Sequence, residues 1–135
     1  MHQKCLCHSN KPYEDCCKPF HLETQYPDPV QLMRSRFSAY ALGLVNYIIE
    51  TTHKEHPDFK KDLDVWKEEI EFFCEATEFV NLKIMEKEIF QTQANVTFIA
   101  YLKQDGNSIK LFEKSLFLKE NERWLYHSGQ VELLK

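Results

Sequence analysis

Residues 93–118 read QANVTFIAYLKQDGNSIKLFEKSLFL, and apolar and polar side chains alternate along the first half of this stretch. A period of two places successive side chains on opposite faces of a β-strand. One face therefore carries Ala94, Val96, Phe98, Ala100 and Leu102. Residues 104–107 contain an Asp-Gly pair, which is a strong local sign of a tight hairpin turn. The stretch predicts two antiparallel strands, over residues 93–103 and 108–118.

Two further strands flank this hairpin. Upstream, residues 78–90 alternate through Val80, Leu82 and Ile84. Downstream, residues 120–122 read Glu-Asn-Glu and form another turn, and residues 123–133 follow as the last strand. Consecutive strands joined by short turns usually pair as neighbours, so we expect a four-stranded antiparallel meander.

Before residue 75 the apolar spacing changes to three and four residues, which is typical of helices. A first helix is expected after Asp28, because Asp28 is a good N-cap, Pro29 suits the first helical position and Gln31 can complete a capping box. Gly43 can end it. Its apolar stripe comprises Val30, Met33, Phe37, Tyr40, Ala41 and Leu44.

Two more helices are predicted, over about residues 45–52 and 59–74. The second of them presents Leu63, Trp66, Ile70 and Phe73 on one face. These apolar stripes need cover, and one face of the sheet supplies it. We therefore predict an α+β fold in which three N-terminal helices pack on a curved four-stranded antiparallel sheet.

Bulk composition excludes several classes of protein. The chain has 135 residues and a formal net charge of −4, with both signs interspersed, so the basic face that nucleic-acid binding needs is missing. No apolar run reaches the roughly 18 residues of a membrane span, and the first ten residues do not resemble a signal peptide. We expect a cytoplasmic protein with reduced thiols, no nucleic-acid partner and no membrane span.

Four of the five cysteines lie in the first seventeen residues, as Cys5, Cys7, Cys16 and Cys17. This segment is too polar to bury a core of its own. Clustered thiolates at such spacing suit a tetrahedral zinc ion, whose binding energy becomes folding energy. Four protein ligands leave no open coordination position. We therefore expect one structural zinc per chain, held in a small N-terminal segment, residues 1–21, which we call the hook.

The stretch CLCHSNKPYEDCC, residues 5–17, resembles the SEC-C motif, the zinc-binding motif at the C-terminus of SecA. Together with LMRSRFSAYALG at 32–43 and KSLFLKENERWLYHSG at 114–129, it makes the chain resemble the bacterial YchJ-type family. That resemblance implies a SEC-C zinc motif over residues 1–21, a linker over 22–28 and a nuclear-transport-factor-2-like domain, a cone-shaped fold, over 29–135.

The resemblance also implies that Cys5, Cys7, Cys16 and Cys17 are the zinc ligands. The family pattern has proline or glycine where this chain has Leu6, His8 and Asn10. Asn10 can replace a glycine because asparagine tolerates the left-handed conformation. His8 or His21 replacing one cysteine as a ligand stays an alternative.

Three functional interpretations follow. The first is an adaptor whose zinc hook contacts a protein partner, and the SecA resemblance links it to protein export or to chaperones such as SecB. The second is a small-molecule-binding or enzymatic domain that uses a pocket of the cone. Candidate lining residues are Arg34, Tyr40, Trp66, Phe98, Glu113, Trp124 and Tyr126. The third is a redox sensor that signals by zinc release.

The remaining chemistry-bearing residues suit structural roles better. Cys74 has no paired base and is expected to be a small buried hydrophobe. His53 and His127 are expected to be hydrogen-bonded framework residues. No nucleotide-binding or hydrolase motif occurs, so no catalytic residue is predicted. A homodimer remains an expectation from the fold resemblance.

Overall fold

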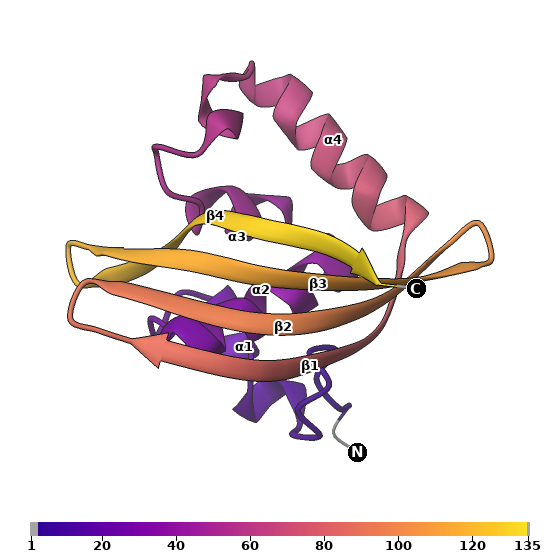
Figure 1. Ribbon diagram of the computed structural model, residues 1–135, viewed down its shortest axis with the longest axis horizontal. Coiled ribbons are helices and arrows are strands. Elements are labelled where there is room, and N and C mark those ends of the chain that lie inside the picture. Colours follow the sequence, from indigo (N-terminus) through magenta and orange to yellow (C-terminus); the bar gives the residue numbers. More distant parts are fainter. Residues whose placement is uncertain (1–2, 135) are drawn as a thin grey trace.

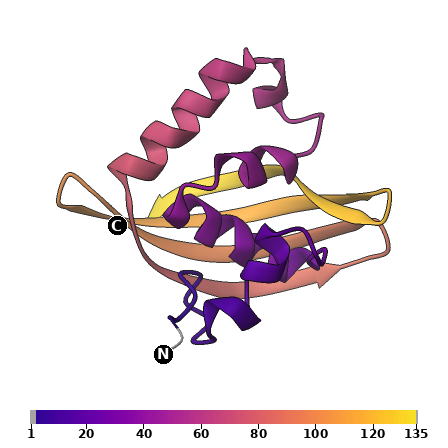
Figure 2. The same ribbon diagram turned by 180° about the vertical axis from the view of Figure 1, so that it is seen from behind.

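The computed structural model describes residues 3–134. The helices are α1 (Lys18–His21), α2 (Pro29–Leu42), α3 (Val45–Glu50) and α4 (Leu63–Ala76), with short 3-10 turns at Tyr13–Asp15 and Pro57–Lys60. The strands are β1 (Glu78–Ile89), β2 (Gln93–Gln104), β3 (Asn107–Glu120) and β4 (Arg123–Leu134). They form one antiparallel sheet in the order β1-β2-β3-β4, with α1, α2 and α3 on the same side of it (Figures 1 and 2). The predicted α+β class is confirmed.

The hairpin prediction is confirmed in detail. Strands β2 and β3 pair from Gln93↔Leu118 to Gln104↔Asn107. Asp105 and Gly106 have φ values of 50° and 76°, the left-handed pair that matches the twist of a two-residue hairpin. The apolar face predicted for β2 is buried along its whole length. It forms the floor of the main core.

Helix α2 lies on the inner face of the sheet, against β1, β2 and β4 (Figure 2). It begins with the predicted capping box, in which Asp28 accepts from the Gln31 amide and Gln31 accepts from the Asp28 amide. It ends at Gly43, whose φ of 74° is the left-handed cap expected of glycine. The single apolar stripe predicted for α2 is too narrow, because the opposite face, with Ser35 and Ser38, is also buried.

Helix α4 leans away from the sheet at its N-terminal end (Figure 1). Trp66 and Ile70 are buried in a second core with Tyr47 and Ile48 of α3. Leu63, predicted to lie on the same buried face, is 51% exposed, because this end of the helix stands clear of the sheet. Among the residues described, no helix is long and apolar enough to cross a membrane.

The capping box gives a first prediction. Asp28→Ala removes the side-chain oxygen that satisfies the Gln31 amide at the start of α2. We expect the free energy of unfolding to fall by about 1 kcal/mol, measured by urea denaturation. Lys54→Ala, at an exposed loop position, is the matched control and should change it by less than about 0.5 kcal/mol. Equal values for the two variants would contradict the capping role.

Candidate metal centre

The hook folds back on itself so that its two cysteine pairs meet. The Cys5 amide donates to the Lys11 carbonyl at 2.8 Å, and the His8 amide donates to the Cys5 carbonyl at 3.2 Å. His8 and Asn10 adopt φ values of 64° and 71°, which turn the chain between the pairs. The 3-10 turn and α1 then carry Cys16 and Cys17 back to the first pair.

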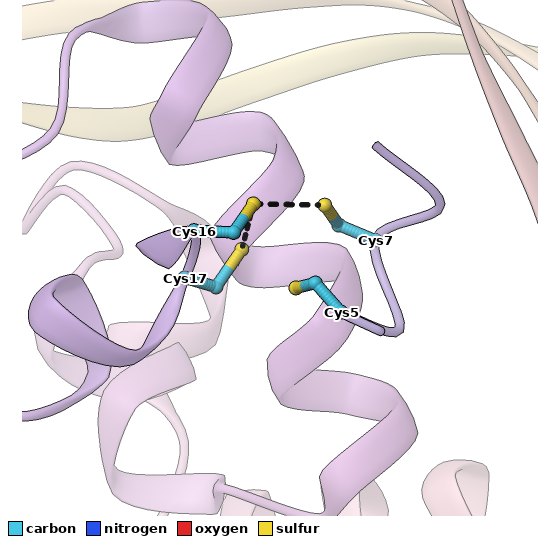
Figure 3. Close-up of side chains that lie close together, drawn as sticks. All are labelled: Cys5, Cys7, Cys16 and Cys17. Atoms are coloured by element: carbon cyan, nitrogen blue, oxygen red, sulfur yellow. Dashed lines mark hydrogen bonds between the residues drawn. The ribbon is translucent and has the colours of Figure 1, made fainter. Parts of the chain in front are cut away.

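The four sulfur atoms lie within 4.8 Å of one another (Figure 3). The Cys7 and Cys16 sulfurs are 3.5 Å apart, and the Cys16 and Cys17 sulfurs are 3.9 Å apart. Zinc–sulfur bonds of about 2.3 Å put the sulfurs of a tetrahedral site about 3.8 Å apart, so the donor set fits zinc. Cys5, Cys7 and Cys17 are buried, and Cys16 is partly exposed.

The pKa shifts of the thiols are compatible with a bound cation. Hydrogen bonds with Cys17 and Cys5 lower the pKa of the Cys7 thiol. Hydrogen bonds with Cys5 and Cys7, together with burial, raise the pKa of Cys17 well above its ordinary value. Ionisation of the Cys7 thiol is therefore favoured, whereas ionisation of the neighbouring Cys17 thiol is disfavoured. A divalent ion would supply the positive charge that lets all four thiols ionise. The Ser9 hydroxyl lies 3.2 Å from the Cys16 sulfur and can donate a hydrogen bond to that sulfur.

The hook is packed on the rest of the protein. Arg34 of α2 donates from Nη1 to the Cys7 carbonyl at 3.1 Å. His21 donates from Nε2 to the Ser35 carbonyl at 2.8 Å and accepts from the Tyr13 hydroxyl at Nδ1, at 2.7 Å. Phe20 lies in the second core beside Trp66. The second face of α2 is thus covered by the hook.

Neither histidine near the hook points into the sulfur cluster. Both ring nitrogens of His21 are engaged elsewhere, and the Nε2 of His8 donates to the Phe79 carbonyl at 3.3 Å. Burial lowers the pKa of His21, which keeps the ring neutral and able to accept from Tyr13. Sequence reasoning considered His21 as a ligand, whereas its contacts make it a docking residue.

His21 gives a second prediction. His21→Ala leaves the Ser35 carbonyl without its donor, and we expect the zinc-loaded protein to lose about 2 kcal/mol of unfolding free energy in urea. His21→Gln, whose amide can donate to the same carbonyl, should lose less. Equal losses for the two variants would show that the ring contributes packing alone.

The family model described as "YchJ, middle NTF2-like domain" matches residues 28–129. This chain belongs to the YchJ family. A relative from Bordetella pertussis, named as a UPF0225 protein, is 35% identical over 131 residues, covering 94% of this chain and 92% of the relative.

Solved structures of SEC-C motif-containing proteins are also similar to this YchJ-family chain. One from Rhodopseudomonas palustris has a TM-score of 0.84 and 32% identity, and the match covers 95% of this chain and 98% of the other. One from Psychrobacter arcticus has a TM-score of 0.75 and 25% identity, with 98% and 85% covered. Both matches extend over the hook and the domain, so the predicted family, its SEC-C motif and its nuclear-transport-factor-2-like fold are confirmed.

The structure divides the seven candidate pocket residues into two groups. Tyr40, Phe98, Glu113 and Tyr126 line a cavity of about 200 Å³ between α2, the end of α4 and the inner face of the sheet. Arg34, Trp66 and Trp124 do not: Arg34 contacts the hook, Trp66 lies in the second core and Trp124 is buried in the main core. The arginine that lines the cavity is Arg36, because residues two apart on a helix point to different faces.

The remaining candidates lie outside both sites. Cys74 is far in sequence from the hook thiols, and burial with the nearby Glu71 and Glu75 raises the pKa of its thiol. His53, Glu55 and His127 form a second cluster of metal-ligating groups. Its histidine nitrogens are already hydrogen-bonded: His53 contacts Glu120 and the Glu55 amide, and His127 contacts Glu55 and Ser128. These contacts favour the framework role.

Proposed function

We propose that this protein is a zinc-stabilised interaction module, in which one structural zinc bound by Cys5, Cys7, Cys16 and Cys17 holds the hook on α2 and so shapes a surface for a protein partner. The observation that carries the proposal is the convergence of the four sulfurs in a hook that packs on the domain. A site closed by four protein ligands suits a structural role better than catalysis.

A groove beside the hook is the surface that this arrangement shapes. It runs from His21 and Leu22 past the junction of α2 and α3 to α4, with a volume of about 670 Å³. Its charged residues are Glu23, Glu50, Glu71 and Lys67. A hydrogen bond with Glu23 raises the pKa of Glu50, as expected of two carboxyl groups held close together. The groove is therefore acidic on balance.

Apolar side chains complete the groove. Leu22, at the end of the hook, is 62% exposed, and Leu44 and Val45 line the same groove. An acidic groove with an apolar strip suits a basic amphipathic segment of a partner protein. The basic side chains of the segment would pair with the glutamates, and its apolar side chains would pack on the apolar strip. The SEC-C resemblance, which links the motif to export and chaperone proteins, agrees with a protein as the partner.

The test combines metal analysis with peptide binding. Protein purified without chelator should contain about one zinc per chain by mass spectrometry, as a closed four-thiolate site requires. A fluorescent lysine- and leucine-rich helical peptide should bind the wild type in a salt-sensitive manner and bind Glu50→Gln, Glu71→Gln more weakly. A double change on the outer face of the sheet, Glu86→Gln, Glu88→Gln, is the charge-matched control. Absence of zinc, or equal peptide binding by both double variants, would refute the proposal.

A further inference from the structure

The cavity under α2 has a lining that is mostly hydrocarbon. Met33, Phe37, Phe79, Phe98, Leu102 and Leu111 supply most of it. Its volume of about 200 Å³ exceeds the roughly 150 Å³ of an apolar cavity known to hold benzene. Two ionisable side chains, Arg36 and Glu113, line the same space. An apolar cavity with a few polar groups is the usual form of a small-molecule site.

Arg36 is a buried cation that has no anionic partner in the part of the chain that the structure describes. Its side chain is 6% exposed, and its Nη1 donates to the Ile48 carbonyl and to the Thr51 and Thr52 hydroxyls at 2.9, 2.7 and 3.1 Å. All three acceptors are neutral. Within residues 3–134, no carboxylate forms an ion pair with Arg36, and no hydrogen bond engages its Nε or Nη2. A buried charge in this state is costly, and an anion beside it would reduce the cost.

Tyr126 separates Arg36 from the one carboxylate of the cavity. The Arg36 guanidinium lies 4.6 Å from the centre of the Tyr126 ring, while the Tyr126 hydroxyl donates to Glu113 Oε2 at 3.1 Å. Ser115 donates to the same oxygen. Burial and the charge of Glu113 raise the pKa of Tyr126, so its hydroxyl stays a donor. The cavity therefore has a cationic end with free donors and an anionic end that is already hydrogen-bonded.

The backbone makes room for this arrangement at Gly129 of β4. A Cβ atom there would collide with the Glu113 carboxylate and would lie 2.7 Å from the Tyr126 hydroxyl. The absence of a side chain at Gly129 keeps Glu113 close to β4. Glu113 is thus held by Tyr126 and Ser115. The Nε and Nη2 groups of Arg36, its free edge, are the polar groups of the cavity that still lack a partner among the described residues.

We propose that this cavity binds a small apolar monocarboxylate of about the size of benzoate. The carboxylate pairs with the free edge of Arg36, whose planar fork matches the geometry of two carboxylate oxygens. The hydrocarbon body contacts the aromatic lining, in particular Phe98. A second negative charge on the ligand is disfavoured, because Glu113 faces the same space. This ligand site shares no lining residue with the groove beside the hook.

The experiment uses the full zinc-loaded chain and a series of ligands that differ in charge. Sodium benzoate should give saturable amide chemical-shift changes in NMR spectra at Phe98, Ala100 and Tyr126. Benzamide, the neutral analogue, should bind at least about tenfold more weakly, and the cation benzylamine should not bind. This series tests the role of the Arg36 charge without a mutation at Arg36, so its three hydrogen bonds at the C-terminal end of α3 stay intact.

A cavity-filling variant provides the second arm. Ala100 lines the cavity and makes no side-chain hydrogen bond, so Ala100→Leu should fill the space, abolish benzoate binding and keep the thermal midpoint within a few degrees. Benzamide binding as tightly as benzoate would overturn the assignment of Arg36. Unchanged benzoate binding by Ala100→Leu would place the ligand elsewhere. Absence of saturation up to about 10 mM benzoate, beyond the range of weak specific ligands, would overturn the site itself.

Discussion

Replacing Cys7 and Cys17 together by serine is expected to abolish zinc binding and to lower the free energy of unfolding by about 4 kcal/mol. Each change removes one thiolate from a different cysteine pair, so no pair of ligands remains intact. Without the metal, the hook has too little apolar surface to stay folded. Phe20 then leaves the second core, and the Ser35 carbonyl loses its bond to His21.

The measurement is urea denaturation of zinc-loaded wild type and variant, with zinc content determined on the same samples. Cys74→Ser is the matched control. Cys74 lies outside the sulfur cluster, so this variant should keep its zinc. Chelation of the wild type should reproduce the loss, and added zinc should reverse it in the wild type alone. Loss of zinc without loss of stability would mean that the hook contributes nothing to the domain.

The sheet and its turns were predictable because their signals are local. Alternation along residues 93–103 and the Asp105-Gly106 pair specify strand and turn within a few residues of each other. The start of α2 was predictable for the same reason, since Asp28 and Gln31 satisfy each other across one helical turn. The meeting of the four cysteines follows from their spacing and from the SEC-C resemblance.

The cover of α2 was not predictable, because it depends on contacts across the chain. Ser35 and Ser38 are not part of the predicted apolar stripe, yet His21 donates to the Ser35 carbonyl and lies 3.3 Å from the Ser38 hydroxyl. The only local sign was a lone histidine four residues after Cys17. Arg34 was the arginine named as a candidate for the cavity, whereas Arg36 lines it. The Arg34-x-Arg36 spacing sends one side chain to each face and does not say which face meets the sheet.

Phe20→Ala is expected to lower the free energy of unfolding by about 3 kcal/mol while the protein keeps its zinc. Phe20 is 8% exposed and packs in the second core with Ala39, Tyr47 and Trp66. Its removal opens a cavity between the hook and the helices. Phe20 is not part of the cysteine cluster, so the geometry of the sulfur atoms needs no change.

This variant separates metal binding from docking. The matched control is Leu22→Ala, two residues along the chain and 62% exposed, which should change stability by less than about 0.5 kcal/mol. Amide exchange should rise in α1 and around Ser35 in Phe20→Ala and stay unchanged in the control. If Phe20→Ala loses zinc as well, docking and metal binding form one cooperative unit. Retained zinc with faster exchange at Ser35 would instead show that zinc folds the hook and that Phe20 fixes it to α2.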